Sequence, residues 1–171
     1  MKRFLFPGVI VANLVLVLAV VNGSILRKQA IVDTGQRVIL ELVPVDPRSL
    51  MQGDYMQLGY ALSRDEAFRN AAEAQGTRGF VVLSLDEKGI GQFARIAEGN
   101  DFLDNEAPLG YRKWRRGFLY GIETFFFEEG SAERFERAKY AELRVSSGGE
   151  PVIVNLLDEE LEVIEPGRDS S

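Results

Sequence analysis

The sequence contains no cysteine and no histidine among its 171 residues. Without cysteine the chain can form no disulfide, offers no thiol nucleophile and binds no metal through thiolates. Without histidine it lacks the commonest general base and metal ligand of proteins. These two absences exclude several classes of enzyme and metal site, and we expect the chain to use neither a cofactor nor a metal.

The chain is also short of basic residues. It has 20 Lys and Arg against 26 Asp and Glu, and four of the bases (Lys2, Arg3, Arg27 and Lys28) flank an apolar N-terminal segment. Subtracting those four leaves 16 bases against all 26 acids, a net charge of −10 for residues 29–171. A domain this acidic repels a phosphate backbone, so we expect no nucleic-acid partner.

An uncharged apolar run extends from Phe4 to Ile25. A helix of this length covers roughly 30 Å, the thickness of the hydrocarbon core of a bilayer. We therefore expect residues 1–28 to form a transmembrane anchor and residues 29–36 a polar linker. A cleaved signal peptide is the alternative, but its apolar region is usually shorter and ends at a small-x-small site. The flanking charges are nearly even and do not set the orientation.

Residues 37–165 are expected to form one β-rich domain, followed by a disordered tail at 166–171. Alternating apolar residues and turn signals predict about seven strands: 37–43, 54–60, 79–86, 90–97, 117–127, 141–147 and 151–157. Ser63 and Glu66 have the spacing of a capping box and predict a helix that ends near Gly76. A second short helix is expected at about 132–140. Because there is no regular βαβ alternation, the pattern indicates an α+β domain with mainly antiparallel sheets, as in a small barrel or sandwich.

The stretch from Val43 to Tyr60 combines several unusual local choices. Asp46-Pro47-Arg48-Ser49 fits a type I turn, and Gly53 suits a positive φ before the next strand. In that strand Asp54, Met56, Leu58 and Tyr60 share one face, which we expect to be the core face. Tyr55 and Gln57 share the other face. The Asp54 side chain can accept hydrogen bonds from the preceding turn and fix this corner.

Gly53 to Tyr60 reads Gly-Asp-Tyr-Met-Gln-Leu-Gly-Tyr and matches the Gly-Asp-Tyr-x-x-Leu-x-Tyr signature of the GDYXXLXY protein family, which the chain resembles. Gly117 to Glu123, with Phe127 to Gly130, is similar to a second landmark of that family. The resemblance implies a small prokaryotic protein with one membrane helix, a companion of multi-spanning membrane proteins. We therefore expect an accessory or binding module on the extracytoplasmic (periplasmic) side of the cell inner membrane. Its candidate interaction residues are Asp46, Pro47, Arg48, Ser49, Gly53, Asp54, Tyr55, Gln57, Leu58, Tyr60 and Glu123.

The same region bears a weaker resemblance to type I signal peptidases, which carry Ser-Met-x-Pro-Thr-Leu-x-x-Gly-Asp next to a membrane anchor on a β fold. Leu50 and Gly53-Asp54 match that pattern, but Val45 occupies the place of the nucleophilic serine. A serine–lysine mechanism needs a hydroxyl beside a lysine that acts as base. Ser49 with Lys88, Lys113 or Lys139 is the remaining combination, so a membrane-bound hydrolase is the alternative to a non-enzymatic module.

Three further features have two readings each. Glu123 with Glu128-Glu129 can supply the carboxylate pair of a glycoside hydrolase, although an acid in an aromatic segment is more often structural. Arg112 to Arg116, with Trp114, can contact anionic lipid headgroups. The reading we favour for that run is an ordinary strand with a buried Trp114. Phe125-Phe126-Phe127 is expected to belong to the core rather than to a docking patch, although three successive aromatics in a strand must show a ring to each face.

Overall fold

The apolar N-terminal segment forms one continuous helix, α1 (Leu5–Thr34), in a computed structural model of the chain. The structure describes residues 5–43, 55–99, 102–115, 117–128 and 130–165, and the expected tail at 166–171 lies outside them. The stretch Val9–Thr34 is long and apolar enough to cross a membrane. Most of the expected linker, 29–36, belongs to this helix. It continues that far because Ile31 is buried where α1 meets the domain.

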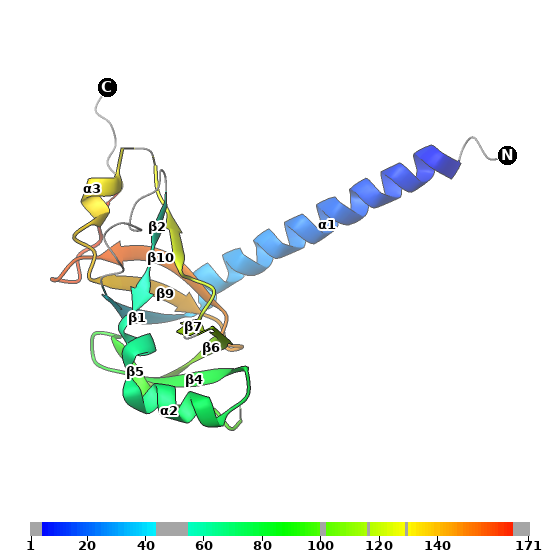
Figure 1. Cartoon of the computed structure of the whole chain (residues 1–171). Helices are drawn as coiled ribbons and strands as arrows, with labels where there is room; N and C mark the ends of the chain where they lie inside the picture. The colour runs from blue at the N-terminus through cyan, green and yellow to red at the C-terminus, as the bar shows by residue number, and fades with distance from the viewer. Residues whose placement is uncertain (1–4, 44–54, 100–101, 116, 129, 166–171) are drawn as a thin grey trace.

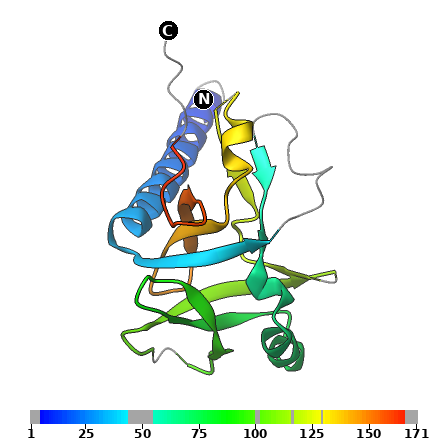
Figure 2. The ribbon, with the colours of Figure 1, turned by 90° about the vertical axis from the view of Figure 1, so that its left-hand side faces the viewer.

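The remaining elements form the domain that Figures 1 and 2 show at the C-terminal end of α1. Its helices are the 3-10 helix η1 (Ala61–Arg64), α2 (Glu66–Ala74) and α3 (Ala132–Phe135). Its strands are β1 (Gln36–Val43), β2 (Tyr55–Gln57), β3 (Gly59–Tyr60), β4 (Arg78–Leu85), β5 (Gly91–Ile96), β6 (Glu106–Trp114), β7 (Gly117–Leu119), β8 (Thr124–Phe126), β9 (Tyr140–Val145) and β10 (Pro151–Leu157).

The described strands form two four-stranded sheets and a two-stranded ribbon. The first sheet has the order β10-β9-β1-β3, the second has the order β5-β4-β6-β7, and β2 pairs with β8 in the ribbon. Every pairing between these strands is antiparallel. In Figure 1, α1 leaves the domain toward the upper right, β2 and α3 lie in the upper part of the domain, and α2 and β4 lie at the bottom.

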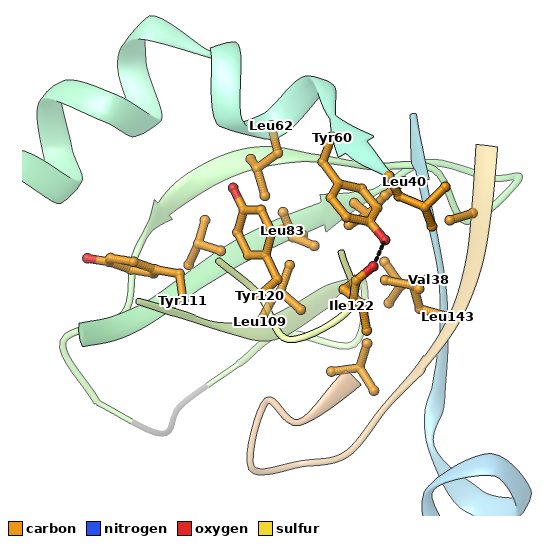
Figure 3. Close-up of a cluster of buried hydrophobic side chains, with 14 of the residues drawn as sticks. Val38, Leu40, Tyr60, Leu62, Leu83, Leu109, Tyr111, Tyr120, Ile122 and Leu143 are labelled. Carbon is orange, nitrogen blue, oxygen red and sulfur yellow. Dashed lines mark hydrogen bonds between the residues drawn. The ribbon is translucent and has the colours of Figure 1, made fainter. Parts of the chain in front are cut away.

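One hydrophobic core joins the two sheets (Figure 3). Val38 and Leu40 of β1 alternate toward it, as expected for one face of a strand. Leu83 of β4 and Leu109 of β6 enter from the other sheet, and Phe68 of α2 is completely buried at its edge. The expected class, α+β with mainly antiparallel sheets, two short α-helices and an N-terminal helix, is confirmed.

Several local predictions are corrected by the fold. The N-cap of α2 is Asp65, whose side chain accepts a hydrogen bond from the Phe68 N–H at 2.8 Å, so the predicted cap at Ser63 is wrong. Ser63 lies instead in η1. The strand expected at 117–127 is split into β7 and β8 by a turn. The helix expected at 132–140 ends at Phe135, because β9 begins at Tyr140.

Candidate functional site

The described part of the Gly-Asp-Tyr motif, residues 55–60, has the two faces that the sequence predicts. Met56, Leu58 and Tyr60 are buried, whereas Gln57 is exposed and Tyr55 is half-buried. The predicted core face is thus confirmed over these residues. The remaining motif positions lie outside the described residues: Asp46, Pro47, Arg48, Ser49, Gly53 and Asp54.

Two hydrogen bonds join the motif to the second landmark of the sequence. The Tyr60 hydroxyl donates to the carbonyl oxygen of Ile122 at 2.6 Å, and the Leu58 N–H donates to the carbonyl oxygen of Glu123 at 2.8 Å. Figure 3 shows the Tyr60 ring reaching across the core to Ile122. The two segments that identify the chain in sequence are therefore packed together in space.

Glu123 closes the turn between β7 and β8. Its carboxylate accepts hydrogen bonds from the backbone N–H groups of Tyr120 and Gly121. Gly121 has a φ of 84°, a conformation that glycine adopts without strain. Because these backbone donors already occupy the carboxylate, Glu123 has a structural role in holding the turn, which is the reading that the sequence favoured over glycoside hydrolysis.

The buried tyrosines of this corner stay protonated and do not act as bases. Tyr60 and Tyr120 pack edge to face with ring centroids 5.7 Å apart, and the Tyr120 hydroxyl lies 3.1 Å from the Ser63 hydroxyl. Burial, reinforced by the nearby Glu123 carboxylate, raises the pKa of Tyr60. Burial also raises the pKa of Tyr120, despite the opposing hydrogen bond with Ser63. Both phenols therefore keep their protons at neutral pH.

The β2–β8 ribbon carries an exposed aromatic side chain next to the motif. Phe126 is 74 % exposed, and its ring centroid lies 6.0 Å from that of Tyr55, its register partner on β2. Phe125 and Phe127 turn the other way and pack on Phe135. The expectation that the three phenylalanines belong to the core is met by two of them, and Phe126 is left on the surface.

Ion pairs tie the C-terminal part of α1 to the β9–β10 turn. The Glu150 carboxylate lies 2.5 Å from the Arg27 guanidinium and 2.8 Å from the Lys28 ammonium. The hydrogen bond from Lys28 is the main reason that the pKa of Glu150 is lowered. The Arg144 side chain adds a hydrogen bond to the carbonyl oxygen of Gly35 at 3.2 Å. These contacts join the C-terminal part of α1 to the first sheet.

A groove of about 600 Å³ borders the same turn. Its walls include Gly149 and Glu150 of the turn, and Arg78, Phe80 and Arg112 of the second sheet. Nearby on β6, Trp114 is 55 % exposed, so the expectation of a buried Trp114 is wrong. The Arg112 guanidinium lies 5.7 Å from the centroid of the Trp114 ring, which is cation–π distance.

The first sheet contains a buried carboxylate, Glu142, that the sequence does not predict. Glu142 is 8 % exposed and accepts hydrogen bonds from Arg37 at 2.5 Å and from Asn155 at 2.7 Å. Burial raises the pKa of Glu142, but the hydrogen bonds from Asn155 and Arg37 outweigh it and the net pKa is lowered. The three residues come from β1, β9 and β10, and their separation in sequence leaves no local pattern that reveals the network.

The Tyr111 hydroxyl, unlike the Glu142 carboxylate, is buried without a hydrogen-bond partner among the described residues. The ring lies across from Gly79, where a β-carbon would approach the hydroxyl oxygen to 2.9 Å, so the glycine makes room for it. Within the described residues no three acidic side chains gather as a metal site.

The fold and this corner define a class of protein: an α+β domain at the end of a long apolar helix, in which a Gly-Asp-Tyr strand is bonded to a Tyr-Gly-Ile-Glu turn. The chain belongs to the GDYXXLXY protein family, whose model matches residues 17–156. This confirms the resemblance carried by the motif. Searches of the curated proteins and of the solved structures found no match.

Proposed function

We propose that this protein is a single-pass membrane-anchored accessory module whose domain, on the extracytoplasmic side of the inner membrane, binds a multi-spanning membrane protein. The observation that carries the proposal is the junction between α1 and the domain. Arg27 and Lys28 directly follow the apolar run, and both pair with Glu150 of the β9–β10 turn. A domain held this way stands at a fixed place beside the bilayer, where it can meet another membrane protein.

The chemistry of the described residues supports binding rather than catalysis. The Glu123 carboxylate is bonded to backbone N–H groups. The Tyr60 and Tyr120 phenols donate hydrogen bonds within the core or lie against the Ser63 hydroxyl. Enzymes keep such groups within reach of a substrate, whereas here the fold itself uses them.

The surface proposed for the partner is the exposed face of the β2–β8 ribbon, formed by Tyr55, Gln57, Thr124 and Phe126. Phe126 is the largest exposed group on it, and Tyr55 supports that ring from the paired strand. Aromatic side chains are enriched among the residues that dominate binding energy at protein interfaces. The ribbon also carries the described end of the family motif, which links the motif to the proposed interaction.

The test is recovery of the tagged full-length protein in detergent, followed by identification of what co-purifies. We expect a multi-spanning membrane protein whose recovery falls at least several-fold with Phe126→Ala. Leu103→Ala is the matched control, because Leu103 is 67 % exposed and lies in a loop away from the ribbon. Equal recovery with both variants would contradict the proposed surface, and recovery of soluble proteins alone would contradict the proposed partner class.

The side of the membrane can be tested separately because the chain has no cysteine. Asn70 lies on α2 and is exposed, so Asn70→Cys introduces one accessible thiol. We expect a membrane-impermeant maleimide to label it in cells whose outer barrier is permeabilised and whose inner membrane is intact. Labelling only after the inner membrane is broken would place the domain in the cytoplasm.

A further inference from the structure

Two arginines stand directly opposite each other on the outer face of the second sheet. Arg78 of β4 and Arg112 of β6 are register partners, and both are exposed. Phe80 lies two residues along β4 and Trp114 two residues along β6, so all four side chains share one face. Phe80 is 45 % exposed and Trp114 is 55 % exposed. We call these four residues the Arg–Trp patch.

The fold does not explain the patch. Like charges directly opposite each other on a sheet are destabilising. Among the described residues, neither arginine forms an ion pair with a carboxylate. The two acids that line the same groove are already engaged, Glu123 by backbone N–H groups and Glu150 by the anchor. In a domain with an excess of acid, this pair is thus left to interact with something outside the part of the chain that the structure describes.

The position of the groove indicates what lies nearby. The groove is lined by Arg78 and Arg112 of the second sheet and by Glu150 of the β9–β10 turn. Glu150 in turn contacts Arg27 and Lys28, the first charged residues after the apolar run. Since those residues mark the level at which a membrane-spanning α1 emerges from the hydrocarbon core, the groove opens beside the bilayer surface.

We propose that the Arg–Trp patch binds the anionic headgroups of membrane phospholipids and so turns this face of the domain toward the bilayer. Arginine forms forked hydrogen bonds with phosphate oxygens. Tryptophan is favoured at the level of the headgroups, and its contact with Arg112 holds that guanidinium in place. An anionic leaflet repels the rest of the acidic domain, so a single basic face gives the domain one preferred orientation.

The protein contains its own reporter for this contact, because Trp114 is its only tryptophan. The full-length chain is inserted into nanodiscs of phosphatidylcholine alone and into anionic discs, in which part of the phosphatidylcholine is replaced by phosphatidylglycerol. The fluorescence emission of Trp114 is recorded in both. We expect a blue shift, and stronger quenching by brominated lipid, in the anionic discs. Both effects should decline as salt screens the charges.

Arg78→Gln is the decisive variant, because Arg78 is not the residue stacked on Trp114. Each basic residue next to an anionic membrane surface strengthens binding to that surface by about fivefold. We expect Arg78→Gln to reduce the anionic blue shift accordingly. Arg69→Gln removes the same charge from an exposed position on α2 that does not line the groove, and should behave as the unaltered protein.

The inference rests on the anchoring part of the proposed function, and the outcomes separate the two. A chain that inserts into both discs but shows the same Trp114 emission in each overturns the headgroup proposal alone. Equal shifts in Arg78→Gln and Arg69→Gln do the same. A shift that appears only when a co-purified membrane protein is present assigns the patch to that protein instead. Failure of the chain to enter any bilayer overturns both proposals.

Discussion

The Tyr60 hydroxyl donates a hydrogen bond to the Ile122 carbonyl oxygen across 62 residues of sequence, at 2.6 Å and inside the core. The last residue of the Gly-Asp-Tyr motif thereby holds the turn that precedes β8. β8 in turn pairs with β2, which carries the first described residues of the motif. The two ends of the described motif therefore contact the same segment, residues 122–126. This relationship gives the motif a structural reason that does not require catalysis.

Tyr60→Phe should destabilise the domain by about 1–2 kcal/mol, because it leaves the buried Ile122 carbonyl without its donor. The measurement is the free energy of unfolding in denaturant with the full-length chain in detergent. The ring itself is kept, so the core packing and the slope of the unfolding curve should be unchanged. A stability equal to that of the unaltered protein would show that this bond does not hold the corner.

Tyr111→Phe is the matched comparison, since the Tyr111 hydroxyl is buried without a partner among the described residues. Removing a polar group that makes no hydrogen bond relieves its desolvation cost. We expect a stability within about 0.5 kcal/mol of the unaltered protein, or above it. A loss as large as that of Tyr60→Phe would reveal that this hydroxyl has a partner.

Acid should weaken the first sheet through Glu142. The folded-state pKa of Glu142 is lowered, so its contribution to stability is fully present above the unfolded pKa and is lost as pH falls through the folded pKa. Glu142→Gln should cost about 1–2 kcal/mol at neutral pH and should flatten the stability curve across that acidic range. Unfolding curves recorded over a pH series test both effects. If the free energy of unfolding of the unaltered protein and of Glu142→Gln changed with pH in parallel, Glu142 would not contribute to the acid sensitivity.

Glu150→Gln should loosen the anchor with little effect on the domain. Arg27 and Lys28 are more than half exposed in their side chains, so the pairs contribute about 0.5 kcal/mol or less to stability. The orientation of α1 should nevertheless become less defined. Spin labels at Asn22→Cys and Asn70→Cys measure the distance between helix and domain, and we expect its distribution to broaden. An equally narrow distribution would show that other contacts hold the junction.

Ser49→Ala distinguishes the module from a signal-peptidase-like hydrolase. Ser49 lies outside the described residues, so the prediction comes from the sequence and from the structural roles of Tyr60 and Tyr120. We expect the variant to remain folded, to keep its membrane partner and to retain full function in cells. Loss of function with folding and partner recovery intact would favour the hydrolase.

Sequence reasoning was right where the signal was local and wrong where a distant segment decided. Alternation correctly predicted the buried face of Met56, Leu58 and Tyr60. The capping box at Ser63 was plausible, but the Ser63 hydroxyl lies against Tyr120 and Asp65 caps the helix instead. The exposure of Trp114 depends on which face of β6 is covered by the rest of the fold, and the spacing of residues in the sequence does not predict which face that is.

Hydrophobic runs, strand periodicity and a contiguous motif are properties of neighbouring residues, so the apolar helix, the mainly antiparallel α+β class and the family can be predicted from the sequence. Three contacts become visible in the three-dimensional structure: Tyr60 bonds to Ile122, Glu150 pairs with Arg27 and Lys28, and Arg78 lies opposite Arg112. Each of these contacts joins residues from different elements. They follow from strand order and register, which the sum of many weak packing interactions sets and no single stretch of sequence contains.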